Sequence, residues 1–245
     1  MPRSLFVSDL HLSAEEPEVV QGFVAFLRER AAGADALYLL GDLFEAWPGD
    51  DELTADDADP AARTIAAALS ALAETGTAVR LMQGNRDFLI RGGFAAACGG
   101  ALIPDPVAVP LEGGDVLALH GDTLCTEDAD YQAWRALSRS DAWQQVFLAR
   151  PLQERREILR RLRARSRESI SRKPADIMDA SAPAIEAAFR RHGVRRMIHG
   201  HTHRPARHAH VVDGSTCERW VLPAWHGASG GWLESRDGQL ELVRF

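Results

Sequence analysis

The sequence predicts an α/β protein with a layered core and a helical insertion. Short apolar runs alternate with helix-like segments over the first 120 residues, which is typical of strands joined by helices. No strand pattern occurs between residues 128 and 191. From residue 209 onward, short apolar runs are separated by Asp-Gly pairs, which favour antiparallel hairpins.

The N-terminal half alternates strand and helix patterns. Strands are expected at residues 4–7, 36–40, 78–82 and 116–119, where short apolar runs end at polar residues or glycine. Helices are expected at residues 18–31, 60–74 and 94–98. The first has apolar residues at helical spacing, and the second is rich in alanine and is followed by Gly76, a common helix terminator.

The second half begins with the predicted insertion. Residues 131–148 carry large apolar side chains at helical spacing, and residues 152–170 are an arginine-rich amphipathic stretch. One more core strand is expected at 194–198, followed by hairpins that turn at Asp213-Gly214 and Asp237-Gly238. A chain of 245 residues fits one well-buried core. We therefore expect a single domain over residues 1–245, with a helical cap inserted at 128–191.

The composition is that of an ordinary globular protein, with 46% hydrophobic and 26% charged residues. No apolar run approaches the roughly 20 residues that span a bilayer, and the first residues show no secretory signal, so we expect a cytoplasmic protein. The net charge of −7 argues against nucleic acid as a partner, and no obligate protein partner is predicted. Three isolated cysteines argue against a disulfide framework and against a Cys-type zinc site.

One segment differs from the rest of the chain in being strongly positive. Residues 150–173 contain ten basic and three acidic side chains. Such a segment is either a solvated helical face or a surface for an anionic partner. Charge alone leaves both interpretations open.

Five polar islands follow apolar runs and carry the chemistry of the chain. They are Asp9-Leu10-His11, Gly41-Asp42, Gly84-Asn85-Arg86-Asp87, His120-Gly121-Asp122 and Gly200-His201-Thr202-His203. Each lies near the end of an expected strand, and the loops at the carboxyl ends of strands are where α/β folds bind ligands. Because side chains alternate along an extended chain, we expect Asp9 and His11 to point the same way.

The islands supply the ligands for two divalent metal ions. These candidate ligands are Asp9, His11, Asp42, Asn85, His120, His201 and His203. Imidazole, carboxylate and amide groups without any thiolate suit Mn, Fe or Zn better than Ca or Mg. Two ions about 3.5–4 Å apart can hold a phosphate between them and activate a water for attack. The sequence thus predicts hydrolysis of a phosphoester or pyrophosphate. Asp87 and Asp122, which directly follow ligands, are expected to orient imidazoles, and His199 is expected to be a strand residue or a supporting partner.

In this order, the islands resemble the calcineurin-like metallophosphoesterase pattern D-x-H, G-D, G-N-H-D, H and G-H-x-H over residues 1 to about 210. The resemblance implies a core of two sheets sandwiched by helices. It also implies one metal held by Asp9, His11, Asp42 and His203, and another held by Asp42, Asn85, His120 and His201. The chain departs at Arg86, where the superfamily usually has a histidine that assists the leaving group. An arginine stays charged and grips phosphate oxygens, which favours a pyrophosphate substrate.

Longer motifs narrow the resemblance. They are S-D-L-H-L at 8–12, G-D-L-F-E-A-W at 41–47, H-G-D-x-L-C-T-x-D-x-x-Y-Q at 120–132 and K-P-x-x-I-M-D at 173–179. The chain is similar here to the UDP-2,3-diacylglucosamine diphosphatase (pyrophosphatase) family of lipid A biosynthesis. The resemblance implies two Mn2+ ions, attack at the α-phosphorus of UDP-2,3-diacylglucosamine, and release of 2,3-diacylglucosamine 1-phosphate (lipid X) and UMP. It also implies a peripheral protein on the cytoplasmic face of the inner membrane, where the arginine-rich stretch would meet an anionic surface.

The resemblance also implies roles for individual residues. Catalysis would involve Asp42, Asn85, Arg86 and His120. Substrate contacts would come from Asn85, Arg86, Asp128, Ser166, Ile170, Lys173 and His201, although the family usually has a polar residue where this chain has Ile170. Trp134, Trp143 and Phe147 either pack in the core of the cap or line a cleft for an acyl chain. The alternative functions are a soluble nucleotide-sugar pyrophosphatase, another calcineurin-like phosphodiesterase, or a scaffold that has lost its metals.

Overall fold

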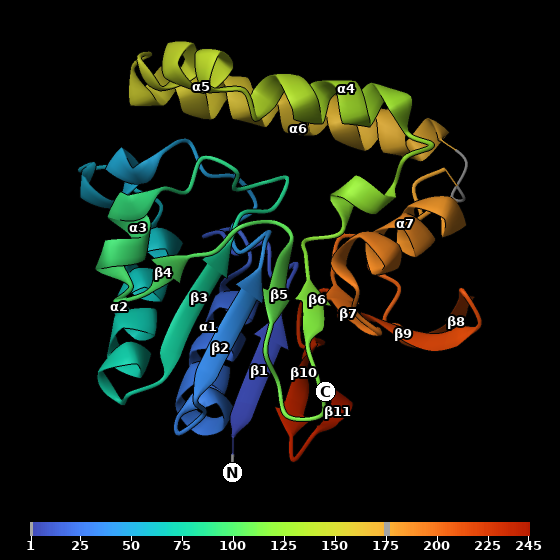
Figure 1. Cartoon of the computed structure of the whole chain (residues 1–245). Coiled ribbons are helices and arrows are strands. Elements are labelled where there is room, and N and C mark those ends of the chain that lie inside the picture. Colours follow the sequence, from blue (N-terminus) through green and yellow to red (C-terminus); the bar gives the residue numbers. More distant parts are fainter. Residues whose placement is uncertain (1, 174–176) are drawn as a thin grey trace.

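Two β-sheets packed face to face form the centre of the molecule, as the computed structural model shows for residues 2–173 and 177–245, without the side chains of 169–172 (Figure 1). The first sheet has the strand order β11-β10-β1-β2-β3-β4 and the second β5-β6-β7-β9-β8. The strands of the first are β1 (Arg3–Val7), β2 (Ala36–Leu40), β3 (Ala78–Met82), β4 (Ala101–Leu102), β10 (Gly231–Arg236) and β11 (Gln239–Arg244). Those of the second are β5 (Val107–Val109), β6 (Val116–Ala118), β7 (Arg196–His199), β8 (Ala206–Val212) and β9 (Ser215–Val221).

Parallel pairing places the functional loops together. Strands β1 to β4 pair in parallel, and β6, β7 and β9 do so in the other sheet. The antiparallel partners β5, β8, β10 and β11 flank these parallel strands. Because parallel strands end at the same edge of a sheet, the loops that follow β1, β2, β3, β6 and β7 lie at one end of the molecule.

Alternating side chains divide the core into layers. Along β1, Leu5 and Val7 join a cluster with the helices on the outer face of the first sheet, whereas Phe6 joins the cluster between the sheets. The cluster between the sheets also contains Leu40, Met82, Val116, Ile198, Trp220, Leu222 and Leu233. Burying apolar surface on both faces of a sheet requires cover on both, and the predicted core of two sheets sandwiched by helices is confirmed.

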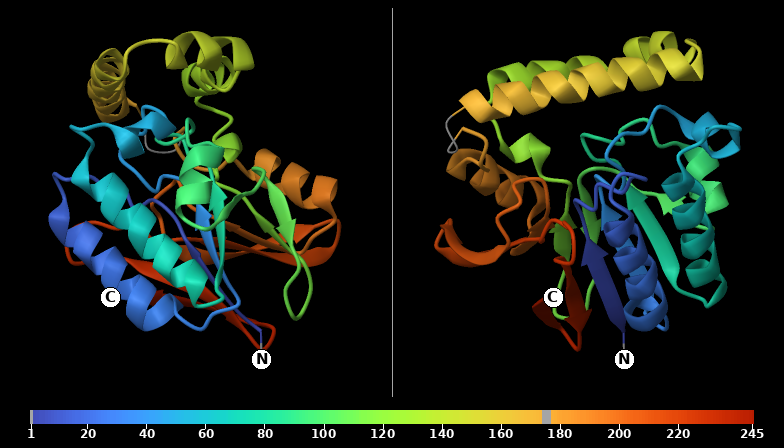
Figure 2. Two further views of the ribbon diagram at one scale, coloured as in Figure 1. Left: turned by 90° about the vertical axis from the view of Figure 1, so that its left-hand side faces the viewer. Right: turned by 180° about the vertical axis from the view of Figure 1, so that it is seen from behind.

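Helices cover the outer faces of the two sheets (Figure 2). Helices α1 (Pro17–Phe26), α2 (Pro60–Glu74) and α3 (Gly92–Ala97) belong to the cluster of the first sheet. Helix α7 (Ala182–His192) buries Ile185 and Phe189 against the second sheet. Helix α2 is preceded by Asp59, an ordinary N-cap whose carboxylate accepts the amide hydrogen of Ala61. The expected helix over 18–31 ends in a wider π-helical turn at Leu27–Ala31.

Both predicted hairpins are present. Asp213-Gly214 connects β8 to β9, and Asp237-Gly238 connects β10 to β11, with all four residues at φ between 51° and 77°. Two successive left-handed residues match the right-handed twist of the flanking strands. The short strands β4 and β5 were not predicted, because runs of two or three residues are too short to show an alternation of apolar and polar positions.

Three further helices form a cap over the carboxyl ends of the strands (Figure 1). They are α4 (Ala129–Ser138), α5 (Asp141–Leu148) and α6 (Leu152–Arg172). Phe147 of α5 is buried in the cluster of the first sheet, and Trp143 stacks on it with ring centroids 4.7 Å apart. Trp134 meets the edge of Trp143 at 5.5 Å. These contacts favour packing between cap and core for Trp143 and Phe147. The predicted insertion at 128–191 also includes most of α7, which packs on the second sheet and not in the cap. The boundaries of the insertion stay a prediction.

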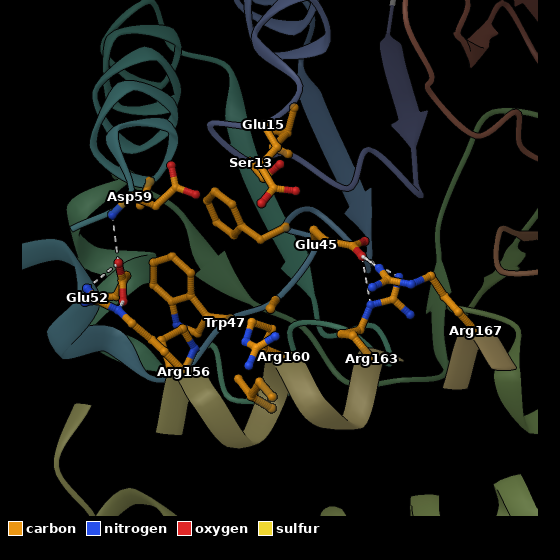
Figure 3. Close-up of a pocket in the computed structure, with 16 residues that line it drawn as sticks. Ser13, Glu15, Glu45, Trp47, Glu52, Asp59, Arg156, Arg160, Arg163 and Arg167 are labelled. Carbon is orange, nitrogen blue, oxygen red and sulfur yellow. Dashed lines mark hydrogen bonds and ion pairs between the residues drawn. The ribbon is translucent and has the colours of Figure 1, made fainter. Parts of the chain in front are cut away.

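Ion pairs also join α6 to the core loops (Figure 3). Arg156 donates two hydrogen bonds of 2.8 Å to Glu52, and Arg163 pairs with Glu45. Arg155 is buried and donates to the Pro48 carbonyl oxygen.

Among the helices that the structure describes, none combines the length and the apolar character of a membrane-spanning segment.

Replacement of Leu37 by alanine tests the core. Leu37 lies in β2 and is fully buried, so Leu37→Ala should lower the free energy of unfolding by about 2–5 kcal/mol through lost burial and a cavity. Leu137→Ala, the same change at a residue that is 53% exposed on the cap, should cost under about 0.5 kcal/mol. Urea denaturation followed by circular dichroism measures both, and equal losses would contradict the assignment of the core.

Candidate metal centre

The five polar islands converge at one end of the two sheets, below the cap. Asp9, Asp42 and Asn85 follow β1, β2 and β3 of the first sheet, and His120 and His201 follow β6 and β7 of the second. The loops after β1 and β2 continue to pair beyond the strands, since the amides of Leu10 and His11 both donate to the Asp42 carbonyl oxygen. The centre therefore lies in the seam between the sheets.

One group of ligands gathers around Asp9. Its Oδ1 lies 3.2 Å from His203 Nε2, and that nitrogen lies 3.4 Å from His11 Nε2. Asp42 Oδ2 is 3.9 Å from His11 Nε2. Asp9, His11 and His203 can each offer one ligand atom, with all of these atoms within 4.8 Å of one another. This spacing suits one cation at their centre.

A second group gathers around Asn85. Its Oδ1 lies 2.9 Å from His120 Nε2 and 2.8 Å from His201 Nδ1. Asp42 Oδ1 is 3.7 Å from the same His120 nitrogen. The two oxygens of Asp42 thus face different groups, which is the position that a bridging carboxylate requires. The seven predicted ligands are all brought together in these two groups.

The donor set fits divalent cations. Nδ1 of His120 donates to the Leu40 carbonyl oxygen at 2.9 Å, so Nε2 is the ring nitrogen that faces Asn85 Oδ1 and would coordinate a cation once its own proton is displaced. Two acceptors that face each other at this distance are stabilised by a cation between them. Nitrogen and oxygen ligands without a thiolate are those that Mn, Fe and Zn accept. The structure therefore supports the ligand chemistry expected from the sequence.

Five of the seven candidate ligands have left-handed backbones. Their φ angles are 55° at Asp9, 50° at His11, 54° at Asp42, 64° at His201 and 52° at His203. Such conformations cost non-glycine residues on the order of 1–3 kcal/mol each and concentrate at functional sites. Asp9 and His11 do face one common position, as expected, but the expected reason, alternation along an extended chain, is wrong. Strand β1 ends at Val7, and the chain turns sharply at both residues.

Two glycines allow the loops to approach the ligands. A Cβ atom on Gly84 would overlap Asp42 Oδ1, and one on Gly200 would overlap Asp9 Oδ2 and Ser8 Oγ. Hydrogen atoms at these positions leave room for the carboxylates. The glycines beside the islands are thus explained by close contact with the metal ligands.

Asp87 holds the loops of the first sheet rather than an imidazole. Its carboxylate accepts the amide hydrogens of Leu43 and Gly84, both at 2.7 Å, and lies 3.3 Å from the Asp42 amide. Burial and the neighbouring Asp42 raise the pKa of Asp87 to about 6. The prediction that Asp87 orients an imidazole is therefore wrong, and its role is to join the Asp42 and Asn85 loops.

Burial and neighbouring charged groups shift the pKa values of the titratable side chains at the centre. Burial opposes protonation of His120, but the carboxylates of Asp42, Asp122 and Asp9 raise its pKa to about 9. Burial and the nearby His120 lower the pKa of His201 to about 4. Burial also opposes ionisation of Asp9, yet His203 and the other histidines hold the pKa of Asp9 below its usual range. A bound cation would replace the protons that these groups share.

His199 lies in β7, as the sequence indicated, and supports the last island. Its Nδ1 donates to the Gly200 carbonyl oxygen at 2.8 Å, and its Nε2 accepts a hydrogen bond from Arg219 at 3.0 Å. Burial and the Arg219 cation lower the pKa of His199 to about 3, so the ring is neutral. Arg219 was not singled out from the sequence, because its place beside His199 depends on the pairing of β7 with β9.

A cavity of about 460 Å³ adjoins the centre and extends under the cap. Its lining includes most of the predicted substrate contacts, namely Asn85, Arg86, Asp128, Ser166, Lys173 and His201. Lys173 pairs with Asp128 across the cavity. Ile170 lies outside the residues whose side chains are described. Tyr131 and Arg165 also line the cavity, and only the folding of α4 and α6 over the centre reveals them.

Arg86 faces the centre. Its Nε is 3.7 Å from Asp42 Oδ2, and its backbone amide donates to Asp42 Oδ1 at 2.8 Å. It lines both the cavity under the cap and a second cavity that includes His11 and His203. Its guanidinium thus lies where a phosphate at the centre would be in reach.

The chain is similar in sequence to known proteins over nearly its whole length. The family described as calcineurin-like phosphoesterase matches residues 2–205. A UDP-2,3-diacylglucosamine hydrolase of Aromatoleum aromaticum is 49% identical over 223 residues, covering 91% of this chain and 89% of that protein. Proteins of the same name from Serratia proteamaculans and Escherichia coli are each 46% identical over 242 residues, covering 99% of this chain and 98% of the relative.

Replacement of Gly84 tests the geometry of the centre. In Gly84→Ala the new methyl group would overlap Asp42 Oδ1 and displace the proposed bridging carboxylate. We expect affinity for Mn2+ to fall at least about tenfold, which corresponds to 1.4 kcal/mol. Gly92→Ala is the matched control, since its Cβ would meet nothing within 4 Å. Titration calorimetry with Mn2+ measures both variants, and equal affinities would contradict the bridging geometry.

Proposed function

The chain belongs to the calcineurin-like phosphoesterase family, and on this premise we propose that it hydrolyses the pyrophosphate bond of UDP-2,3-diacylglucosamine. The products would be 2,3-diacylglucosamine 1-phosphate (lipid X) and UMP. The observation that carries the proposal is the convergence of seven candidate nitrogen and oxygen ligands beside a cavity under the cap. The names of relatives with 45–49% identity support the choice of substrate.

We propose two Mn2+ ions as the resident cofactor. When bound, they would neutralise charge on the phosphate oxygens and lower the pKa of the water that attacks the α-phosphorus. Asp9, His11 and His203 would hold one ion, and Asn85, His120 and His201 the other, with Asp42 shared between them. Asp9, Asp42 and His120 are buried, and with the other candidate ligands on short loops from two sheets they would hold the ions at a defined spacing.

Arg86 would bind the substrate's phosphate as a permanent cation. Its guanidinium lies beside Asp42 and lines two cavities that meet at the centre. A guanidinium does not release a proton near neutral pH, so it stabilises negative oxygens rather than protonating a leaving group. The leaving sugar phosphate needs little protonation, which fits this residue. Lys173, paired with Asp128, would add a second cation to the same cavity.

The apolar part of the substrate would lie between α6 and the core loops. A cavity of about 290 Å³ is lined there by Leu12, Phe44, Trp47 and Leu159 (Figure 3). Arginine side chains of α6 and acidic residues of the core surround this apolar surface. A groove with apolar walls and a charged rim suits an acyl chain attached to a polar head.

We further propose peripheral binding at the cytoplasmic face of the inner membrane. Arg160 and Arg161 on α6 are 72% and 68% exposed, while Leu137 and Val146 are exposed on α4 and α5. Exposed arginines are attracted to anionic lipid, and exposed apolar side chains can enter the membrane interface. Both arginines pair with Glu157, which lessens the attraction.

An enzymatic assay tests the proposed reaction. Incubation with Mn2+ and UDP-2,3-diacylglucosamine should yield UMP and the acylated sugar phosphate, and EDTA should abolish turnover. Asp42→Ala should lower kcat by at least about a thousandfold, since it removes a ligand of both proposed ions, whereas Asp56→Ala on the exposed surface should have no effect. In water labelled with oxygen-18, attack at the α-phosphorus places the label in UMP. Equal turnover of a UDP-sugar without acyl chains would favour a soluble nucleotide-sugar pyrophosphatase instead.

Flotation with lipid vesicles tests the membrane proposal. The chain should float with anionic vesicles at low salt and be released at 1 M salt, where charges more than about 3 Å apart are screened. The double variant Arg160→Glu with Arg161→Glu should no longer float. The matched variant Arg190→Glu with Arg191→Glu, which changes the net charge equally on α7, should float like the wild type. If the wild type floats neither at low salt nor at 1 M salt, membrane association is refuted.

A further inference from the structure

Arg135 of helix α4 connects the cap to two buried carboxylates. Its Nε donates to Asp122 Oδ2 at 2.8 Å, and its Nη2 lies 3.3 Å from Asp105 Oδ2. The Asp122 side chain is fully buried and that of Asp105 is 8% exposed. One planar guanidinium can bind two carboxylates at once, because its donors point in fixed, separate directions. Arg135 is therefore the cation that both acids share.

Both carboxylates belong to the surroundings of His120. The other oxygen of Asp105 accepts the backbone amide hydrogen of His120 at 3.1 Å. Asp122 follows His120 by two residues and begins the short 3-10 turn Asp122–Leu124. Arg135 thus holds the His120 loop at two points, through Asp105 at the His120 backbone amide and through Asp122, two residues further along the chain.

Other side chains of α4 strengthen this attachment. Tyr131 donates its hydroxyl to Asp122 Oδ2 at 2.6 Å, and Gln132 donates to the Asp122 carbonyl oxygen at 2.8 Å. At the end of α4, Arg139 donates to the Gly84 carbonyl oxygen at 2.8 Å, next to Asn85. Helix α4 therefore contacts both loops, those of His120 and Asn85, that supply the second group of ligands.

We infer that Arg135 is a positioning residue for the second metal ion and couples the cap to one ion of the pair. The inference rests on the proposed two-ion centre and adds a role that the ligands themselves do not reveal. Helix α6 reaches the other group of ligands more weakly. Its Arg163 pairs with Glu45, and Glu45 Oε2 is 3.5 Å from His11 Nδ1, which is long for a hydrogen bond.

Loss of Arg135 has a clear physical consequence. Asp105 would keep the His120 amide, and Asp122 would keep the Tyr131 hydroxyl and the more distant Arg139 at 3.9 Å. Both buried carboxylates would lose the cation that they share, and weaker compensation of a buried charge is unfavourable. The two acids would also repel each other, so the His120 loop would shift to hydrate or separate them. His120 Nε2 would then leave its position 2.9 Å from Asn85 Oδ1. The second ion would lose a ligand, whereas the ligands Asp9, His11 and His203 would keep their places.

Metal binding by Arg135→Gln tests the inference without any substrate. Calorimetric titration with Mn2+, supported by electron paramagnetic resonance of bound Mn2+, should resolve two ions in the wild type. In Arg135→Gln, one ion should bind at least about tenfold more weakly, equivalent to 1.4 kcal/mol, and the other should bind as in the wild type. Arg135→Lys should be intermediate, because an ammonium group keeps the charge but not the paired geometry.

Arg156→Gln provides the matched control. It also removes an arginine–carboxylate pair between cap and core, that with Glu52, but at a distance from the His120 loop. Both ions should bind to it with unchanged affinity. A similar effect of the two variants would show that any break between cap and core weakens the centre, and this would overturn a specific role for Arg135.

The remaining outcomes are also decisive. Unchanged binding of both ions to Arg135→Gln, or equal weakening of both, would overturn the inference. If circular dichroism shows that Arg135→Gln is unfolded, the folded Arg135→Lys decides by the same criterion. A wild-type chain that binds fewer than two ions would refute the proposed two-ion centre itself, and the inference with it, whereas two tightly bound ions without hydrolysis of UDP-2,3-diacylglucosamine would refute only the proposed substrate.

Discussion

Burial of negative charge at the seam between the two sheets is the constraint on which the rest of the structure depends. Asp9, Asp42, Asp87 and Asp122 are all buried within one group of loops. Carboxylates out of water need cations or hydrogen-bond donors nearby. The chain supplies backbone amides to Asp87, an arginine to Asp122 and imidazoles to Asp9 and Asp42. The four histidines and these carboxylates are candidate ligands for divalent metal ions.

The sheets provide the stability of the fold, and the loops at their ends carry the polar side chains. Apolar clusters on both faces of each sheet fix the strand ends, so the loops between them can adopt unfavourable backbone conformations. The left-handed residues at the centre depend on this rigid support. Asp87 then links two of these loops by three amide contacts, and His199 supports a third. These contacts fix the loops that carry the candidate ligands.

The cap packs on the core and covers cavities that adjoin the centre. Phe147 and Trp143 pack it on the core, and the ion pairs of α6 align it with the loops after β2. Cavities on either side of Arg86 meet at the metal centre, as a substrate with two unlike halves requires. The proposed substrate, a nucleotide joined through pyrophosphate to an acylated sugar, has this form. Arg135 makes α4 part of the metal centre as well as part of its cover.

The sequence by itself determined the ligand types, their order and most of the strands and helices, because these follow from local apolar periodicity and from short motifs. It also determined both Asp-Gly hairpins, whose turns depend on two adjacent residues. The family resemblance implied how the candidate ligands divide between two groups, but no local pattern shows it. The tertiary structure brings the groups together, since sheet pairing joins five loops spread over almost two hundred residues. For the same reason the short strands β4 and β5, the amide contacts of Asp87 and the place of Arg135 were beyond sequence patterns. Such contacts depend on distances between segments far apart in the chain, which no local periodicity records.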